Sequence, residues 1–154
     1  MVCYSIYNLL VVLFGVGVGR MAVYRSALRF TGLLLVAYAL AGEIRLLYFP
    51  IHGTEGERAI SDNMNIILTG SIVLLTPLAI GYGASASGKR FRRYSIGTIV
   101  VLILFAIGAS INNTRIEEHL STPGLGIIER VYWYVVLLWI AMLSRILLRG
   151  IKPA

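Results

Sequence analysis

Five stretches of this chain are apolar over lengths that can cross a lipid bilayer. A membrane-spanning helix needs roughly 20 mostly apolar residues, and a helix satisfies its own backbone hydrogen bonds in lipid. The apolar runs lack the alternation of a membrane-barrel strand and are too long for one. We therefore predict an all-α, polytopic transmembrane bundle that forms a single domain over residues 1–154, with spans at residues 3–19, 30–49, 64–86, 95–111 and 127–149.

The composition agrees with a membrane protein and excludes two other classes. The chain is 58% hydrophobic and 14% charged, whereas a soluble domain is about 25% charged. A disordered chain would be far more polar, and an ordinary soluble enzyme would carry more charge. Because the connections between the predicted spans are short, any functional site must be built from the helices and these loops.

The basic residues gather on one side of the predicted membrane. Cytoplasmic loops of membrane proteins carry an excess of Lys and Arg. Ten of the 14 basic residues share one side, namely Arg20, Arg25, Arg29, Lys89, Arg90, Arg92, Arg93, Arg145, Arg149 and Lys152. All seven acidic residues fall on the other side, at positions 43, 55, 57, 62, 117, 118 and 129.

This charge distribution predicts the orientation in the cell membrane. We expect a cytoplasmic C-terminus and extracytoplasmic loops at residues 50–63 and 112–126. Five spans then place Met1 outside, which is the arrangement that would remain if a sixth helix preceded the first span. The first span has no basic residue ahead of it, unlike a secretory signal peptide.

A glycine-rich segment at residues 83–89 partly matches a phosphate-binding loop. Such a loop follows a strand and has Ser or Thr after its Lys, but here an apolar helix precedes and Arg90 follows. We expect the small residues to end the third helix, and we expect no nucleotide or nucleic acid as a partner. The basic residues of the loop that follows are expected to contact lipid headgroups; they are Lys89, Arg90, Arg92 and Arg93.

Two pairs of small residues have a spacing that lets helices approach closely. These are Gly15 with Gly19, and Ala37 with Ala41. We expect them to serve packing within the chain, with a homo-oligomer as the alternative. Trp139 lies deep in the last span, where packing is a more natural role than ligand contact.

Glu43 is the acidic residue that lies deepest in a predicted span. It is six residues before Phe49, and thus about 9 Å inside the helix end. An ionisable residue within a span is costly and is usually paired or functional. We expect its partner on another element, with Arg130 and Arg58 as candidates.

The same membrane level holds the other candidate site residues, which with Glu43 are His52, Asp62, Asn65, Glu129 and Arg130, with His119 nearby. Three interpretations stay open. Glu43 and Arg130 form a structural ion pair while His52 caps a loop. Alternatively, His52, Asp62 and Glu43 hold a zinc ion that activates water on a lipid or small substrate. In the third, Glu43 couples a proton or cation to transport or sensing.

Short motifs near the helix starts carry a family resemblance over residues 8–149. They are Phe49-Pro50 with His52, Asp62, Gly88, Phe91-Arg92, Tyr94-Ser95, Thr122-Pro123, Gly126 and Glu129-Arg130. On these the chain resembles the prokaryotic multi-pass membrane proteins grouped as domain of unknown function family 998. The resemblance implies six helices and no established activity. Many such proteins have His three residues after the acid that opens helix three, where this chain has Asn65, so a His–Asp–His metal site would lack one ligand here.

Overall fold

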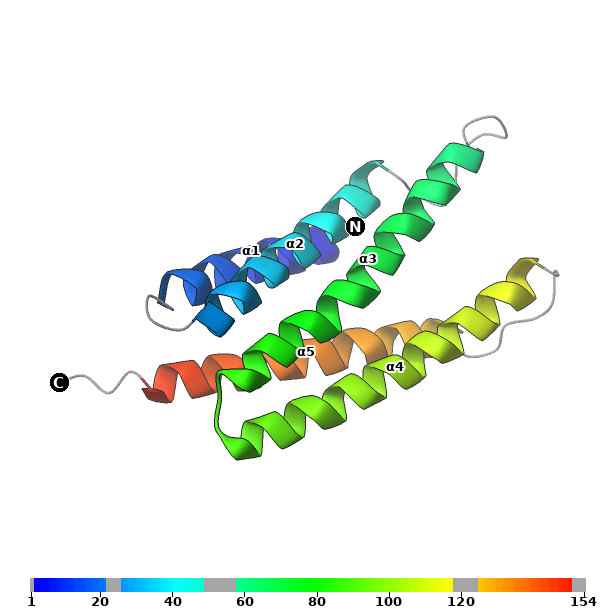
Figure 1. The fold of residues 1–154 in the computed structure, drawn as a ribbon. Helices are drawn as coiled ribbons and strands as arrows, with labels where there is room; N and C mark the ends of the chain where they lie inside the picture. Colours follow the sequence, from blue (N-terminus) through cyan, green and yellow to red (C-terminus); the bar gives the residue numbers. More distant parts are fainter. Residues whose placement is uncertain (1, 22–25, 49–57, 118–124, 151–154) are drawn as a thin grey trace. The chain divides into compact units, whose positions relative to one another are not determined.

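The computed structural model of this protein describes residues 2–21, 26–48, 58–117 and 125–150. These residues form five helices, and none of them lies in a strand (Figure 1). The helices are α1 (Val2–Met21), α2 (Ser26–Tyr48), α3 (Arg58–Ser85), α4 (Lys89–Glu117) and α5 (Leu125–Gly150). Each is long and apolar enough to cross a membrane. The prediction of an all-α, multi-pass membrane protein with five spans is confirmed.

The helices extend beyond the predicted spans at several ends. α2 begins at Ser26 and α4 at Lys89, several residues before the predicted starts. An apolar run marks only the part of a helix that suits lipid, whereas Lys and Arg are good helix formers and continue it into water. The assignment of the basic run to a loop was therefore wrong, because Lys89 to Arg93 form the first turns of α4. The connections before α3 and after α4 are also shorter than predicted, because the mostly polar residues 58–63 and 112–117 continue these two helices.

The glycine-rich segment between α3 and α4 ends a helix, as predicted. α3 stops at Ser85, and the Ala86 amide still donates to the Tyr82 carbonyl at 3.3 Å. The Gly88 carbonyl then accepts from the Arg92 amide at 3.1 Å, in the first turn of α4. The segment is a tight helix–helix connection.

The helices group into two compact units, residues 1–86 and residues 87–154. In the first unit α2 contacts both α1 and α3, and it therefore lies between them (Figure 1). The aromatic rings of Phe30 and Tyr82 meet between α2 and α3, with centroids 5.5 Å apart. The buried side of α2 recurs every three or four residues, at Leu28, Thr31, Gly32, Leu35, Tyr38, Ala39 and Gly42.

α1 and α2 approach until their backbones touch. A Cβ atom on Gly32 would lie 2.5 Å from the Gly15 carbonyl oxygen and 2.8 Å from the Gly19 nitrogen. Such distances leave no room for any side chain at this crossing, so glycine is required there. The prediction that Gly15 serves packing within the chain is confirmed, and the Gly19 backbone lies beside Gly32, although a Cβ on Gly19 itself would meet nothing within 4 Å. The homo-oligomer through small-residue faces stays a prediction.

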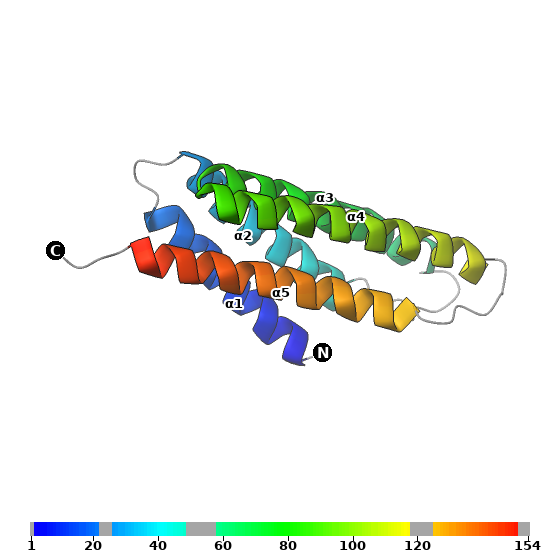
Figure 2. The ribbon, with the colours of Figure 1, turned by 90° about the horizontal axis from the view of Figure 1, so that it is seen from below.

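The second unit is built around one tryptophan. Trp139 of α5 has no solvent-exposed surface, and its indole N–H donates to the Ser95 hydroxyl of α4 at 2.9 Å. Its ring also meets that of Phe91, with centroids 5.9 Å apart. Figure 2 shows the two helices lying side by side. Trp139 is thus a packing residue, as predicted.

Candidate functional site in the α1–α2 hairpin

α1 and α2 form an antiparallel hairpin with two different ends. We call the end at Met21 and Ser26 the loop end, and the end at Val2 and Tyr48 the open end. The glycine contact lies toward the loop end. The side-chain hydrogen bonds between the two helices lie toward the open end, and they involve the candidate residue Glu43.

The Glu43 carboxylate lies beside two polar side chains of α1 and is hydrogen-bonded to one of them. The Asn8 amide nitrogen donates to Glu43 Oε2 at 2.8 Å, and the Ser5 hydroxyl lies near the same carboxylate. Asn8 is buried, with 4% of its surface exposed, and Glu43 is half-buried. Among the described residues, both of these side chains next to Glu43 are uncharged.

The local sequence explains why these groups meet. Asn8 and Glu43 each lie five residues inside the open end of their spans, Cys3–Met21 and Ser26–Tyr48. In an antiparallel hairpin such residues lie at the same depth. Gly42 makes room for the amide, because a Cβ at that position would lie 3.2 Å from Asn8 Oδ1 and 3.4 Å from Nδ2.

A second polar contact lies beside the first. The hydroxyl groups of Tyr7 and Tyr38 are hydrogen-bonded at 3.1 Å, and Tyr38 is only 2% exposed. Tyr7 immediately precedes Asn8 on α1. The open half of the hairpin therefore contains a polar layer between two mostly apolar helices.

This arrangement suits a group that changes its protonation state. An ionised carboxylate accepts hydrogen bonds, and a protonated one also donates. The Asn8 amide can both donate and accept, and so can the Ser5 hydroxyl. The cluster can therefore satisfy Glu43 with or without a proton.

Arg45 is close to Glu43 in sequence but lies on another side of α2. Two residues along a helix correspond to about 200° of rotation. Arg45 is half-buried, and its Nε atom is enclosed with no hydrogen-bond partner among the described residues.

The other predicted site residues have different outcomes. His52 and His119 lie outside the described residues. Asp62 lies on α3 and Glu129 on α5, but their side chains lie outside the description. The convergence of Glu43 with His52 and Asp62 stays a prediction.

Asn65 and Arg130 are described together with their side chains. Asn65 is half-buried on α3, and its Oδ1 accepts from the Thr69 hydroxyl at 3.4 Å, a contact within one helix. Arg130 is exposed on α5, in the second unit. Its ion pair with Glu43 stays a prediction, as does the pair with Arg58, whose side chain is not described.

The remaining candidates are the ligands of the predicted zinc site and the basic residues predicted to contact lipid headgroups. Within the described part of the chain, no three His, Cys, Asp or Glu residues gather closely enough to hold a metal ion. The zinc site of His52, Asp62 and Glu43 stays a prediction, because His52 and the side chain of Asp62 lie beyond that part. The candidate headgroup ligands on α4 are exposed; they are Lys89, Arg90, Arg92 and Arg93.

Sequence reasoning missed Asn8 and Ser5 as partners of Glu43. Both are uncharged, and the search for a partner considered cations. The signal that identifies Asn8 is its depth, because it is the amide in the first span that matches Glu43 in the second.

Comparisons of this chain with protein-family models, with curated proteins and with solved structures give no match.

Proposed function

We propose that this protein is a proton- or cation-linked transporter or sensor of a prokaryotic plasma membrane, with Glu43 as the group that binds the proton or cation. The hydrogen bond from Asn8 to Glu43 is the observation that carries this proposal. It places an ionisable group at a helix–helix contact inside the membrane span, where a change in its charge acts directly on the packing of α1 against α2.

The uncharged partners of Glu43 favour this role over a purely structural one. A structural contact between two helices needs a hydrogen bond but no ionisable group, and a carboxylate in a span is costly. Asn8 stabilises the carboxylate by a hydrogen bond without cancelling its charge. A proton or a small cation is the ligand that would cancel it.

The charge distribution supports a position of the site on the extracytoplasmic side of the membrane. With the basic side in the cytoplasm, Glu43 belongs to the extracytoplasmic half of the membrane, and the C-terminus is cytoplasmic. The apolar faces of the helices contact lipid, and the exposed basic residues at the start of α4 meet its headgroups. We also propose, from the motifs given above, that the protein is a member of domain of unknown function family 998.

Infrared spectroscopy of Glu43→Gln in lipid tests the titration. Gln keeps the size of the side chain and its capacity to accept from Asn8, but it cannot gain a proton. We expect the carboxyl bands of the wild-type protein to include a pH-dependent component from Glu43 that is missing in the variant. Asn8→Ala should move the band without removing it, because it changes the hydrogen bond and leaves the carboxyl.

Proteoliposomes test the coupling. With a pH-sensitive dye inside and an imposed proton or Na⁺ gradient, we expect wild-type flux, or a gradient-dependent change in Trp fluorescence, that Glu43→Gln abolishes. Glu117→Gln, at the end of α4, is the matched control and should behave like wild type. A Glu43→Gln protein with unchanged flux and unchanged fluorescence response would leave Glu43 a structural residue.

A further inference from the structure

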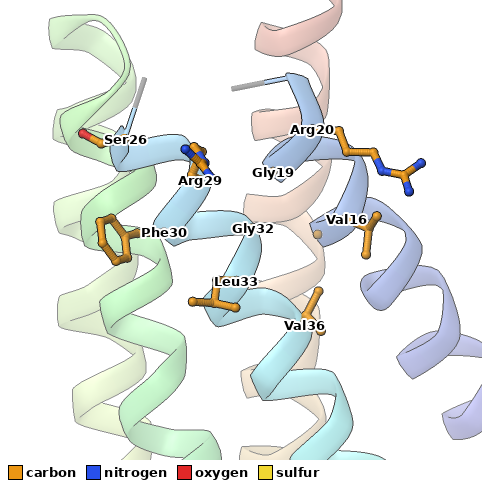
Figure 3. Close-up of a pocket in the computed structure, with 10 residues that line it drawn as sticks. Val16, Gly19, Arg20, Ser26, Arg29, Phe30, Gly32, Leu33 and Val36 are labelled. Carbon is orange, nitrogen blue, oxygen red and sulfur yellow. The ribbon is translucent and has the colours of Figure 1, made fainter. Parts of the chain in front are cut away.

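A groove lies between α1 and α2 toward the loop end of the hairpin, away from Glu43 (Figure 3). It has a volume of about 650 Å³, and all of its lining residues belong to these two helices. Gly15, Gly19 and Gly32 line it where the backbones touch. Because glycine has no side chain, the space beside this contact stays unfilled. The apolar side chains of Leu33 and Val36 also line the groove.

The groove has a basic rim at the loop end. Arg20 of α1 and Arg29 of α2 belong to its lining, and both are exposed. In Figure 3 Arg29 stands at the top of α2 beside Ser26, while Arg20 extends from α1 away from α2. The chain has no acidic residue before Glu43, so the sequence of these two helices offers the rim no carboxylate at this end.

The depth of the groove residues matches the layers of a bilayer. Arg20 is one residue from the end of the span Cys3–Met21, and Arg29 is in the first turn of the span Ser26–Tyr48. Long arginine side chains at such positions reach the headgroup level. Leu33 and Val36 lie one and two turns further along α2, in the part that faces hydrocarbon.

We propose that this groove binds an anionic phospholipid. The lipid phosphate is held by Arg20 and Arg29, since guanidinium groups bind phosphate through paired hydrogen bonds. One acyl chain lies along the glycine contact against Leu33 and Val36. An apolar groove with two cations at its headgroup end is complementary to an amphiphile with an anionic head, and a free phosphate would use only the rim. The site is separate from Glu43 and does not depend on the proposed function.

Lipid binding to the purified full chain tests the proposal. Native mass spectrometry of the protein in detergent, titrated with phosphatidylglycerol or phosphatidylcholine, gives the occupancy of each lipid. We expect a preference for phosphatidylglycerol. Replacing Arg20 and Arg29 by Gln should weaken its binding about five-fold for each arginine, since a cation near an anionic lipid surface contributes about 1 kcal/mol. The matched control is the double replacement of Arg145 and Arg149 by Gln, which are exposed on α5 and outside the groove lining, and which should keep the preference.

A second variant separates the acyl chain from the headgroup. Leu33→Trp fills the groove and should reduce the occupancy of both lipids. Leu40→Trp, at another exposed position of α2 outside the groove lining, should have no effect. These exposed positions tolerate a larger side chain without disturbing the α1–α2 contact.

Three results would overturn the proposal. The first is equal binding of both lipids by the wild-type protein, a result that does not depend on the folding of any variant. Glycerol phosphate binds as tightly as phosphatidylglycerol, which makes the rim a free-phosphate site. A Leu33→Cys protein in a Cys3→Ser background cross-links to itself in proteoliposomes and keeps its lipid occupancy, which makes the groove a contact between two copies.

Discussion

The α1–α2 and α4–α5 contacts solve the same packing problem in opposite ways. Between membrane helices there is little hydrophobic driving force, because lipid tails are as apolar as leucine side chains. α1 and α2 have glycines at their contact, and the backbones meet at Gly15 and Gly32 because no side chain separates them. α4 and α5 instead enclose the largest side chain, Trp139, between Phe91 and Ser95.

This difference decides where each pair can hold a ligand. A backbone contact is narrow along the helix axis, so the hairpin has a groove beside it and a polar layer at the open end. The tryptophan instead fills the space around it, and its one polar group is satisfied by Ser95. The polar layer and the groove therefore belong to the glycine-based pair.

The largest expected effect removes the tryptophan. Trp139→Ala should destabilise the protein by about 3 kcal/mol, because it opens a cavity and leaves the buried Ser95 hydroxyl without its donor. Leu138→Ala is the matched control, since Leu138 is an exposed neighbour on α5 and should change stability little. Unfolding in a detergent–denaturant titration, followed by circular dichroism, measures both. Equal destabilisation of the two variants would contradict the packing role.

A smaller effect is expected from one methyl group in the hairpin. Gly32→Ala places a Cβ against the backbone of α1 and should cost about 2 kcal/mol, because backbone atoms cannot move aside as a side chain can. Gly17→Ala is the control on α1. A Cβ there meets nothing within 4 Å, and alanine is the better helix former, so this variant should be neutral or more stable. If both alanines behave alike in the same titration, the backbone contact is absent.

The sequence predicts the five spans well but places their ends and partners less well. Apolar runs identify the part of each helix that suits lipid, and all five such parts are helical. Lys89 to Arg93 were assigned to a loop, since hydropathy does not distinguish a charged helical turn from a loop. Asn8 was overlooked because the depth at which two spans cross depends on which helices pair, and the Gly15–Gly32 contact that aligns them joins residues far apart in sequence.

In the polar layer, we expect the contribution of Asn8 to stability to depend on the charge of Glu43. Asn8→Ala should cost about 1–2 kcal/mol, since it removes a buried donor to a charged acceptor. In a double-mutant cycle with Glu43→Gln, we expect the Asn8 contribution to fall, because a neutral acceptor forms a weaker hydrogen bond. Stability of the four proteins in the same titration gives the coupling energy. Strict additivity would show that Asn8 does not sense the charge of Glu43.

The smallest expected effect comes from the tyrosine pair, which shows how much of the polar layer is only structural. Tyr7→Phe keeps the ring and removes one hydroxyl from a 3.1 Å contact with Tyr38. Hydrogen bonds between membrane helices contribute about 0.6 kcal/mol on average, so we expect a loss of this size. Tyr48→Phe, at the exposed end of α2, should cost less. The Tyr7→Phe protein should also retain the infrared band and the flux that depend on Glu43, since the hydrogen bond to its carboxylate comes from Asn8. If Tyr7→Phe instead abolished the flux while stability fell by no more than this amount, the tyrosine pair would belong to the proton or cation path, and the site would extend beyond Glu43 and Asn8 into the centre of the hairpin.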